Sequence, residues 1–291
     1  SDGRTLAVDL EINANKANRA RLNQNPTKSQ REILGALQVI YFSPEDLDLV
    51  RGEPTGRRDF LDKLLITRTP RLAGVISDYD RVVRQRNTLL KTRAPENSLA
   101  PWTEQLIALG SALTAERIAL VEKLNPYVGA HYANLNEVKA ASIAYKSSTE
   151  GLTTDIENNV AVLTAKQIEV ARNEIERGVS LIGPHRDDLH LHLGDFPAKG
   201  YASHGESWSM AISLRIASFT LLRDEGSSPI LILDDIFAEL DTARRAQLVA
   251  ITHLAEQTFI TAAVESDLPA DLKTERFYVT PGKVTRQEGV A

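Results

Sequence analysis

A run of four large aliphatic residues followed by two acids, ILILDD at 230–235, constrains the fold of this chain more than any other feature of its sequence. Four consecutive aliphatic side chains predict a strand that is covered on both faces, as in parallel sheets. The two carboxylates then stand at the carboxyl end of that strand, where open α/β sheets bind their ligands. In a Walker B arrangement, Asp234 would hold Mg²⁺, and Asp235 would orient and deprotonate the attacking water. The same run also fits a core strand that ends in an acidic turn.

A second motif, Ser203-His-Gly-Glu206, opens the amphipathic helix predicted for residues 206–223. Small residues at a helix start leave backbone N–H groups free at the positive end of the helix dipole, which favours an anion. Ser203 as an ordinary N-cap, with Glu206 in the first turn, is the alternative. Together with the acidic strand just downstream, the motif is typical of an ABC-type signature, which makes Ser203, Gly205 and Glu206 candidate nucleotide contacts.

Two further positions belong to the same expected site. Asp241, in Glu239-Leu240-Asp241, falls where ABC-type ATPases have their D-loop. Thr261 lies at the end of a strand predicted for residues 258–262, where such enzymes place a switch residue, although the usual histidine is absent. We therefore count both residues among the candidate nucleotide contacts.

The hydropathy pattern divides the chain into three regions. Residues 1–55 begin as a strand in which Leu6, Val8, Leu10 and Ile12 alternate with smaller or charged residues, which predicts one buried face. Residues 56–178 show helical spacing, with Pro101 and Pro126 expected to separate helices. Residues 179–291 alternate strands and helices, which predicts an α/β lobe with a largely parallel sheet. The helical region is then an arm inserted between two pieces of that lobe.

The net charge of −5 excludes a globally basic nucleic-acid binder, but the charge is uneven. Residues 1–100 hold 17 Lys/Arg and 13 Asp/Glu, and residues 12–31 hold no acid at all. A local basic face could meet phosphate, and solvated helix or strand faces are the alternative. The candidates for DNA contact are Lys16, Arg19, Arg21, Arg57, Arg58, Arg81 and Arg84.

Cysteine is absent, which excludes a disulfide framework and a Cys-ligated zinc site. No apolar run approaches the roughly 18 residues that a membrane span needs, and the first residues lack the pattern of a signal peptide. We expect a cytoplasmic protein without a membrane partner.

Four stretches resemble the RecF family of bacterial ATPases, which belongs to the SMC/ABC class, in both order and spacing. They are PEDLDLVRGEPTGRRDFLD (44–62), GPHRDDL (183–189), ASHGES (202–207) and LILDDIFAELD (231–241). The first two are more specific than a signature or a Walker B motif, which transporter subunits also carry. The resemblance covers the whole chain and implies an α/β fold, the head of an ABC-type P-loop ATPase with an inserted helical arm. It also places Glu45 near the Q-loop position.

The resemblance implies DNA replication and repair controlled by ATP and Mg²⁺. RecF-like ATPases form homodimers with ATP between the Walker B acid of one subunit, here Asp234, and the signature of the other. Ser203 and Gly205 would then contact the γ-phosphate in trans. The family binds gapped DNA at single-strand/double-strand junctions, and with RecO and RecR it promotes loading of RecA in recombinational gap repair and the SOS response.

One departure from the family pattern is large. The 291 residues contain no G-x-x-x-x-G-K-[ST] phosphate loop, since the one Gly-Lys pair, Gly282-Lys283, is followed by Val284. We expect a fragment that lacks the first α/β segment and binds ATP weakly or not at all by itself. Whether this chain alone is an enzyme therefore stays open. The alternatives are the nucleotide-binding subunit of an ABC transporter and a non-enzymatic DNA or protein interaction module.

Overall fold

A parallel three-stranded sheet joins the two ends of the chain. The computed structural model describes residues 6–135, 139–269, 272 and 274–287. The strand order is β4 (Val39–Phe42), β8 (Ile230–Asp234) and β9 (Thr258–Thr261), with both pairs parallel. Leu231 and Leu233 of the central strand are fully buried, as the aliphatic run predicts. The carboxyl ends of the three strands therefore lie at one edge, which carries the predicted acids.

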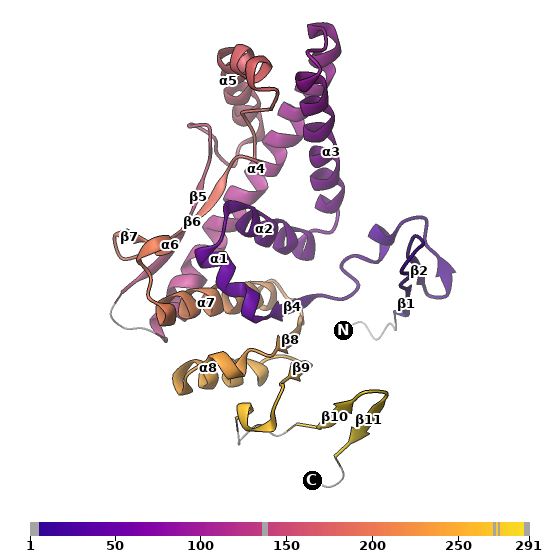
Figure 1. Cartoon of the computed structure of the whole chain (residues 1–291), viewed down its shortest axis with the longest axis vertical. Helices are drawn as coiled ribbons and strands as arrows, with labels where there is room; N and C mark the ends of the chain where they lie inside the picture. The colour runs from indigo at the N-terminus through magenta and orange to yellow at the C-terminus, as the bar shows by residue number, and fades with distance from the viewer. Residues whose placement is uncertain (1–5, 136–138, 270–271, 273, 288–291) are drawn as a thin grey trace.

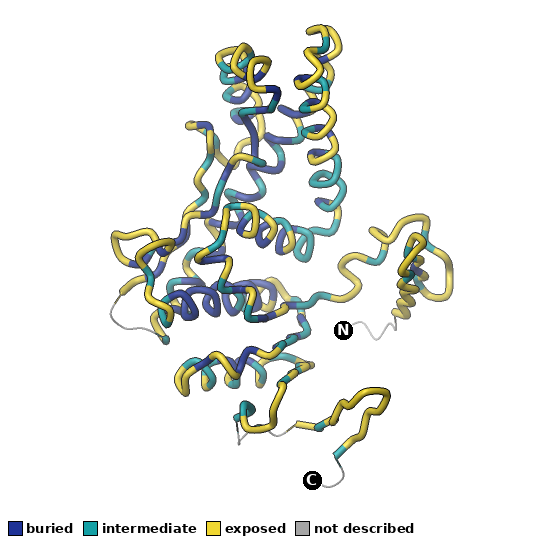
Figure 2. Tube along the Cα trace, in the orientation of Figure 1, coloured by how far each residue is buried: buried dark blue, intermediate teal, exposed yellow. Residues whose placement is uncertain are grey.

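Helix α7 (His204–Asp224) is the main covering of this body and contacts β4, α1 (Leu47–Arg51) and α4 (Glu96–Ala133). Its buried residues occur all around the helix, and Figure 2 shows it as buried along most of its length. Such a helix lies inside a core instead of on a surface. Helix α8 (Thr242–Thr252) follows β8 and leads to β9.

The predicted helical region projects from the body as α3 (Leu72–Lys91), α4 and α5 (Ile156–Arg177), preceded by α2 (Pro54–Arg68) (Figure 1). The expectation that prolines separate helices here is wrong, because Pro101 and Pro126 both lie inside α4. Leu124 and Val128, on either side of Pro126, are fully buried. Burial of this kind offsets the backbone hydrogen bond that a proline removes.

Among the described residues there are also three small antiparallel sheets. They are β1 (Val8–Glu11), β2 (Arg19–Leu22) and β3 (Asn25–Pro26); β5 (Ala141–Lys146), β6 (Asp188–Leu193) and β7 (Phe196–Pro197); and β10 (Phe277–Thr280) with β11 (Lys283–Arg286). Short helical turns lie at α6 (Ala198–Tyr201), η1 (Gln30–Ile33), η2 (Pro44–Asp46), η3 (Phe237–Glu239) and η4 (Glu265–Asp267).

The predicted buried face of the first strand is wrong. Leu6 and Leu10 are each 50% exposed and Ile12 is 77% exposed, because no described element covers this face of the β1–β2 hairpin. The domain boundaries at 55 and 178 stay predictions. Strand β5 precedes the second boundary and β6 follows it, and the two strands pair along their full length.

Candidate functional site

The carboxylate of Asp234, at the end of β8, accepts hydrogen bonds from two neighbouring strands. Thr261 at the end of β9 donates from Oγ1 to Oδ1 at 2.5 Å, and the Tyr41 hydroxyl of β4 donates to Oδ2. The bond from Thr261, and then that from Tyr41, lowers the pKa of Asp234. The hydrogen bond to Asp234 raises the pKa of Tyr41 to about 12. Asp234 is therefore an anion in a fixed orientation at the sheet edge.

Asp235 turns away from the strand at once. Its φ of +50° is a left-handed conformation, which Asp adopts more readily than most residues. Its backbone N–H donates to the hydroxyl and carbonyl oxygens of Thr261 at 3.0 and 3.2 Å, while its side chain remains exposed. The turn gives the two carboxylates different surroundings. The first is held by hydroxyl groups, and the second is open to solvent. Their roles in holding Mg²⁺ and activating water stay predictions.

Oxygen ligands suit Mg²⁺, which usually binds one or two carboxylates together with substrate phosphates. The described residues contain no group of three or more His, Cys, Asp or Glu side chains that could hold a metal ion. Glu45, the residue at the predicted Q-loop position, lies close enough to feel the charge of Asp234. Its pKa is lowered mainly by a hydrogen bond from Ser43, and Asp234 opposes that shift.

Ser203 caps the start of α7 in a capping box. Its Oγ accepts from the N–H of Glu206 at 3.2 Å, and its own N–H donates to Glu206 Oε2 at 2.8 Å. Lys139 donates to the other carboxylate oxygen of Glu206 at 2.7 Å, and chiefly this bond lowers the pKa of Glu206 to about 2. The predicted N-cap is therefore present, and because Ser203 is exposed, the helix start is also accessible to an anion.

Asp241 is the N-cap of α8 and accepts from the N–H of Arg244 at 3.0 Å. The Arg244 guanidinium pairs with the Asp241 carboxylate and donates to the carbonyl of Gly205 at 2.8 Å. The structure thus brings the predicted D-loop and signature together through a residue that sequence reasoning missed. Tyr41 was missed as well, although its position at the end of a strand parallel to 230–234 could have indicated it.

Arg57 must be removed from the candidates for DNA contact. It is only 4% exposed, and its guanidinium donates to both carboxylate oxygens of Asp188 at 2.7 and 2.8 Å and to the carbonyls of Leu49 and Gly52. These bonds leave it unavailable to phosphate. Arg58 is half-buried and donates to the carbonyl of Asp187 at 2.9 Å. The two resembling stretches 44–62 and 183–189 are therefore joined by these arginines.

The remaining basic candidates are exposed. Arg81 and Arg84 lie on α3, and Arg81 forms a surface ion pair with Asp78 at 3.2 Å. Lys16 lies in the loop of the β1–β2 hairpin, with Arg19 and Arg21 on β2. The strand register places acidic residues of β1 opposite both hairpin arginines, which weakens the local positive potential. DNA contact by these residues stays a prediction.

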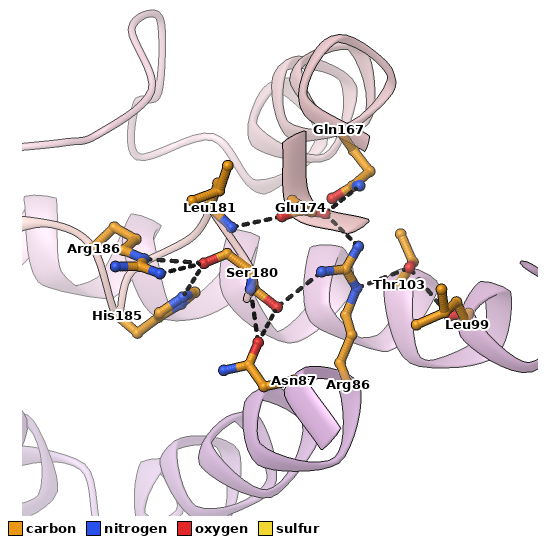
Figure 3. Close-up of polar contacts among 10 residues, drawn as sticks. All are labelled: Arg86, Asn87, Leu99, Thr103, Gln167, Glu174, Ser180, Leu181, His185 and Arg186. Atoms are coloured by element: carbon orange, nitrogen blue, oxygen red, sulfur yellow. Dashed lines mark hydrogen bonds and ion pairs between the residues drawn. The ribbon is translucent and has the colours of Figure 1, made fainter. Parts of the chain in front are cut away.

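Arg86, which lies on the same helix as Arg81 and Arg84, is part of a buried network (Figure 3). It donates to Glu174 Oε2 at 2.6 Å and to Ser180 Oγ at 2.8 Å. Arg186 donates twice to the Ser180 carbonyl, and His185 Nε2 lies 3.3 Å from the same oxygen. Burial lowers the pKa of His185 to about 4. This network fixes the 183–189 turn against the arm.

A search against protein-family models finds no match. The chain is 48% identical over 308 residues to the DNA replication and repair protein RecF of Rhodococcus erythropolis (strain PR4 / NBRC 100887), covering 96% of this chain and 75% of that protein. Within the described part of the chain, no helix has both the length and the apolar character that crossing a membrane requires.

Solved structures of RecF have the same fold. The recombination mediator protein RecF-ATPrS in the RecFOR pathway superposes with a TM-score of 0.85 at 24% identity, over 96% of this chain and 76% of that one. RecF-ATP of the same pathway gives 0.83 at 22%, over 95% and 74%. An Smc head bound to the C-terminal winged-helix domain of ScpA gives 0.51 at 11%, over 99% and 69%. The predicted ABC-type ATPase head with an inserted helical arm is confirmed.

Proposed function

The chain belongs to the RecF family of DNA replication and repair proteins, and from this premise we propose that it supplies the Walker B strand, the signature and the D-loop of an ATP-gated, DNA-binding dimer. The observation that carries the proposal is the position of Asp234. It is an ionised carboxylate, oriented by Thr261 and Tyr41, at the carboxyl edge of a parallel sheet. An acid with a purely structural role would be expected inside the core instead of at a sheet edge where ligands bind.

Each residue then has a distinct task. Asp234 would hold Mg²⁺, which when bound neutralises phosphate charge. Asp235, exposed beside it, orients the attacking water and accepts its proton. The start of α7, with Ser203 and Gly205, offers N–H groups and a positive dipole end to a γ-phosphate held by another subunit. Thr261 orients Asp234 at the end of β8, and Asp241 lies beside the start of α7 through its pairing with Arg244. ATP shared in this way closes the dimer, and hydrolysis reopens it.

We propose gapped DNA as the nucleic-acid ligand, bound in the cytoplasm by the exposed basic residues of the hairpin and of α3. RecO, RecR and RecA are proposed partners by family membership. The identity of 48% to a RecF protein is the reason to set aside the transporter alternative, which requires membrane partners. The interaction-module alternative is still to be tested, because these 291 residues hold no phosphate loop.

The missing loop suggests the experiment. In a shared site, the signature acts on nucleotide bound by the other subunit, so this chain can complete a site whose phosphate loop comes from the Rhodococcus erythropolis relative. We expect Mg·ATP to strengthen association of the chain with the immobilised relative by at least about 10-fold, since a shared charged ligand contributes more than 1.4 kcal/mol. Ser203→Arg, which places a bulky cation at the helix start, removes that gain.

Asp155→Ala is the matched control, because Asp155 caps α5 through a 2.9 Å bond to the N–H of Glu157 on the arm. It costs about 1 kcal/mol of helix capping, like loss of the Ser203 cap, but leaves the signature intact. Association that ignores nucleotide, or that survives Ser203→Arg, refutes the ATP-gated function and favours the interaction module.

A further inference from the structure

Arg244, in the first turn of α8, bonds to two parts of the predicted site, the signature and the D-loop. Its Nε donates to Ser209 Oγ at 3.0 Å, and its Nη2 donates to the Gly205 carbonyl at 2.8 Å. Its Nη1 pairs with Asp241, which also accepts from the Arg244 backbone N–H. One planar guanidinium therefore joins the first two turns of α7 to the cap of α8.

This contact supplies a second reason for glycine at position 205. A Cβ built on Gly205 would lie 3.0 Å from Arg244 Nη2, and 3.6 Å from its Cζ. A side chain at 205 would push the guanidinium away from the carbonyl to which it is bound. Because Gly205 has no side chain, Arg244 can approach the backbone of the signature closely. This reason for glycine does not depend on a bound phosphate.

The positive charge of Arg244 lies at the start of a helix, an unfavourable position for a cation. A cation beside a helix start is repelled by the positive end of the dipole. The Asp241 carboxylate offsets this cost, which makes the position of Arg244 depend on the conformation of residue 241. Only the segment 235–240 separates Asp241 from Asp234, and Ile236, Phe237 and Leu240 of that segment are buried. The segment that joins the acidic edge of the sheet to the start of α8 is therefore packed into the core.

We propose that Arg244 is a positioning residue that holds the signature of its subunit, at the start of α7, against the predicted D-loop at the start of α8. The inference rests on the proposed function, and it adds a residue that sets the geometry of the signature presented to the partner's nucleotide. It fixes Gly205 and Asp241 relative to each other, so that the signature meets the partner's γ-phosphate in one arrangement.

The test uses the 291-residue chain with a variant of the Rhodococcus erythropolis relative in which the counterpart of Ser203 is arginine. Homodimers of that variant lack a working signature, so ATP turnover reports mixed pairs. Arg244→Ala is expected to lower kcat per mixed pair by at least about 10-fold, because misplacing a reacting group by about 1 Å costs up to 10²-fold. KM for ATP stays within about twofold, since the relative's own loop holds the nucleotide. Arg244→Lys behaves like alanine because one ammonium cannot replace the fork.

Gln247→Ala is the matched control, since Gln247 lies on the same helix, donates to the Asn134 carbonyl at 3.4 Å away from the D-loop, and is predicted to leave kcat unchanged. A thermal melt of each variant separates loss of folding from loss of turnover. An Arg244→Ala chain that forms fewer pairs but has normal kcat per pair overturns the inference and leaves the proposed function intact. A wild-type chain that gives no turnover with the relative overturns both.

Discussion

The buried ion pair between Arg86 and Glu174 allows the arm to be tested apart from the ATP site. The two side chains are 3% and 0% exposed, and the Arg86 guanidinium also donates to Thr103 Oγ1 at 3.0 Å. Removing one partner of such a pair costs about 3–5 kcal/mol, because the other charge remains buried without compensation. In Arg86→Met, Glu174 would still accept from Gln167 Nε2 at 2.8 Å and from the Leu181 N–H at 2.6 Å. We therefore expect a loss at the lower end, about 3 kcal/mol.

The assay is urea unfolding at neutral pH followed by far-UV circular dichroism, with the free energy obtained by linear extrapolation. Arg86→Met with Glu174→Met should recover at least about 1 kcal/mol of the single-variant loss, since no uncompensated charge then remains. The control is Arg172→Ala, which removes an exposed pair with Glu176 and should change stability by less than about 0.5 kcal/mol. A loss below about 1 kcal/mol in Arg86→Met refutes the reasoning.

Three further predictions concern pH and DNA. The pKa of Glu206 is about 2 in the folded state against an ordinary 4.5, so its stabilising contribution is present above pH 4.5 and is lost as the pH falls toward 2. Glu206→Gln should therefore reduce the fall in stability between pH 4.5 and 2. An unchanged pH profile of stability contradicts this. His185 is neutral in the folded state down to about pH 4, whereas an unfolded histidine binds a proton near 6.5. Stability should therefore fall as pH drops from 6.5 to 4, and His185→Gln should reduce that slope in thermal melts across this range. Alanine at Lys16, Arg19 and Arg21 should weaken binding to gapped DNA equally for all sequences and lower the salt slope by roughly 2–3, measured by fluorescence anisotropy; a sequence-dependent loss would show base contacts instead.

Much of the fold could be predicted because its signals are local. The aliphatic run at 230–233 forms the central strand, and the helix predicted to end near Gly178 does so with a left-handed glycine at φ +66°. The prolines inside α4 led to a wrong prediction. Burial of Leu124 and Val128 stabilises the helix there despite the low helix propensity of proline.

The site was harder to predict, since it depends on which strands and helices become neighbours. Asp234 and Thr261 could be placed because strand ends in a parallel sheet meet at one edge. Tyr41 was open to the same reasoning, because β4 is also parallel to β8. Arg244 could not be predicted, because its partner Gly205 lies on another helix. Arg57 misled for the same reason, since charge patterning alone cannot distinguish a solvated arginine from a buried arginine that is paired with a carboxylate.

Counting nucleotides in the mixed pair is the most direct test of the central claim. The pair of this chain with its Rhodococcus erythropolis relative should be isolated with Mg²⁺ and a slowly hydrolysed ATP analogue, and the bound nucleotide quantified. We predict one nucleotide per pair, held by the relative's loop and closed by Ser203 and Gly205 of this chain. Pairs that form with no nucleotide bound, or that hold one equally well after Ser203→Arg, would contradict the account.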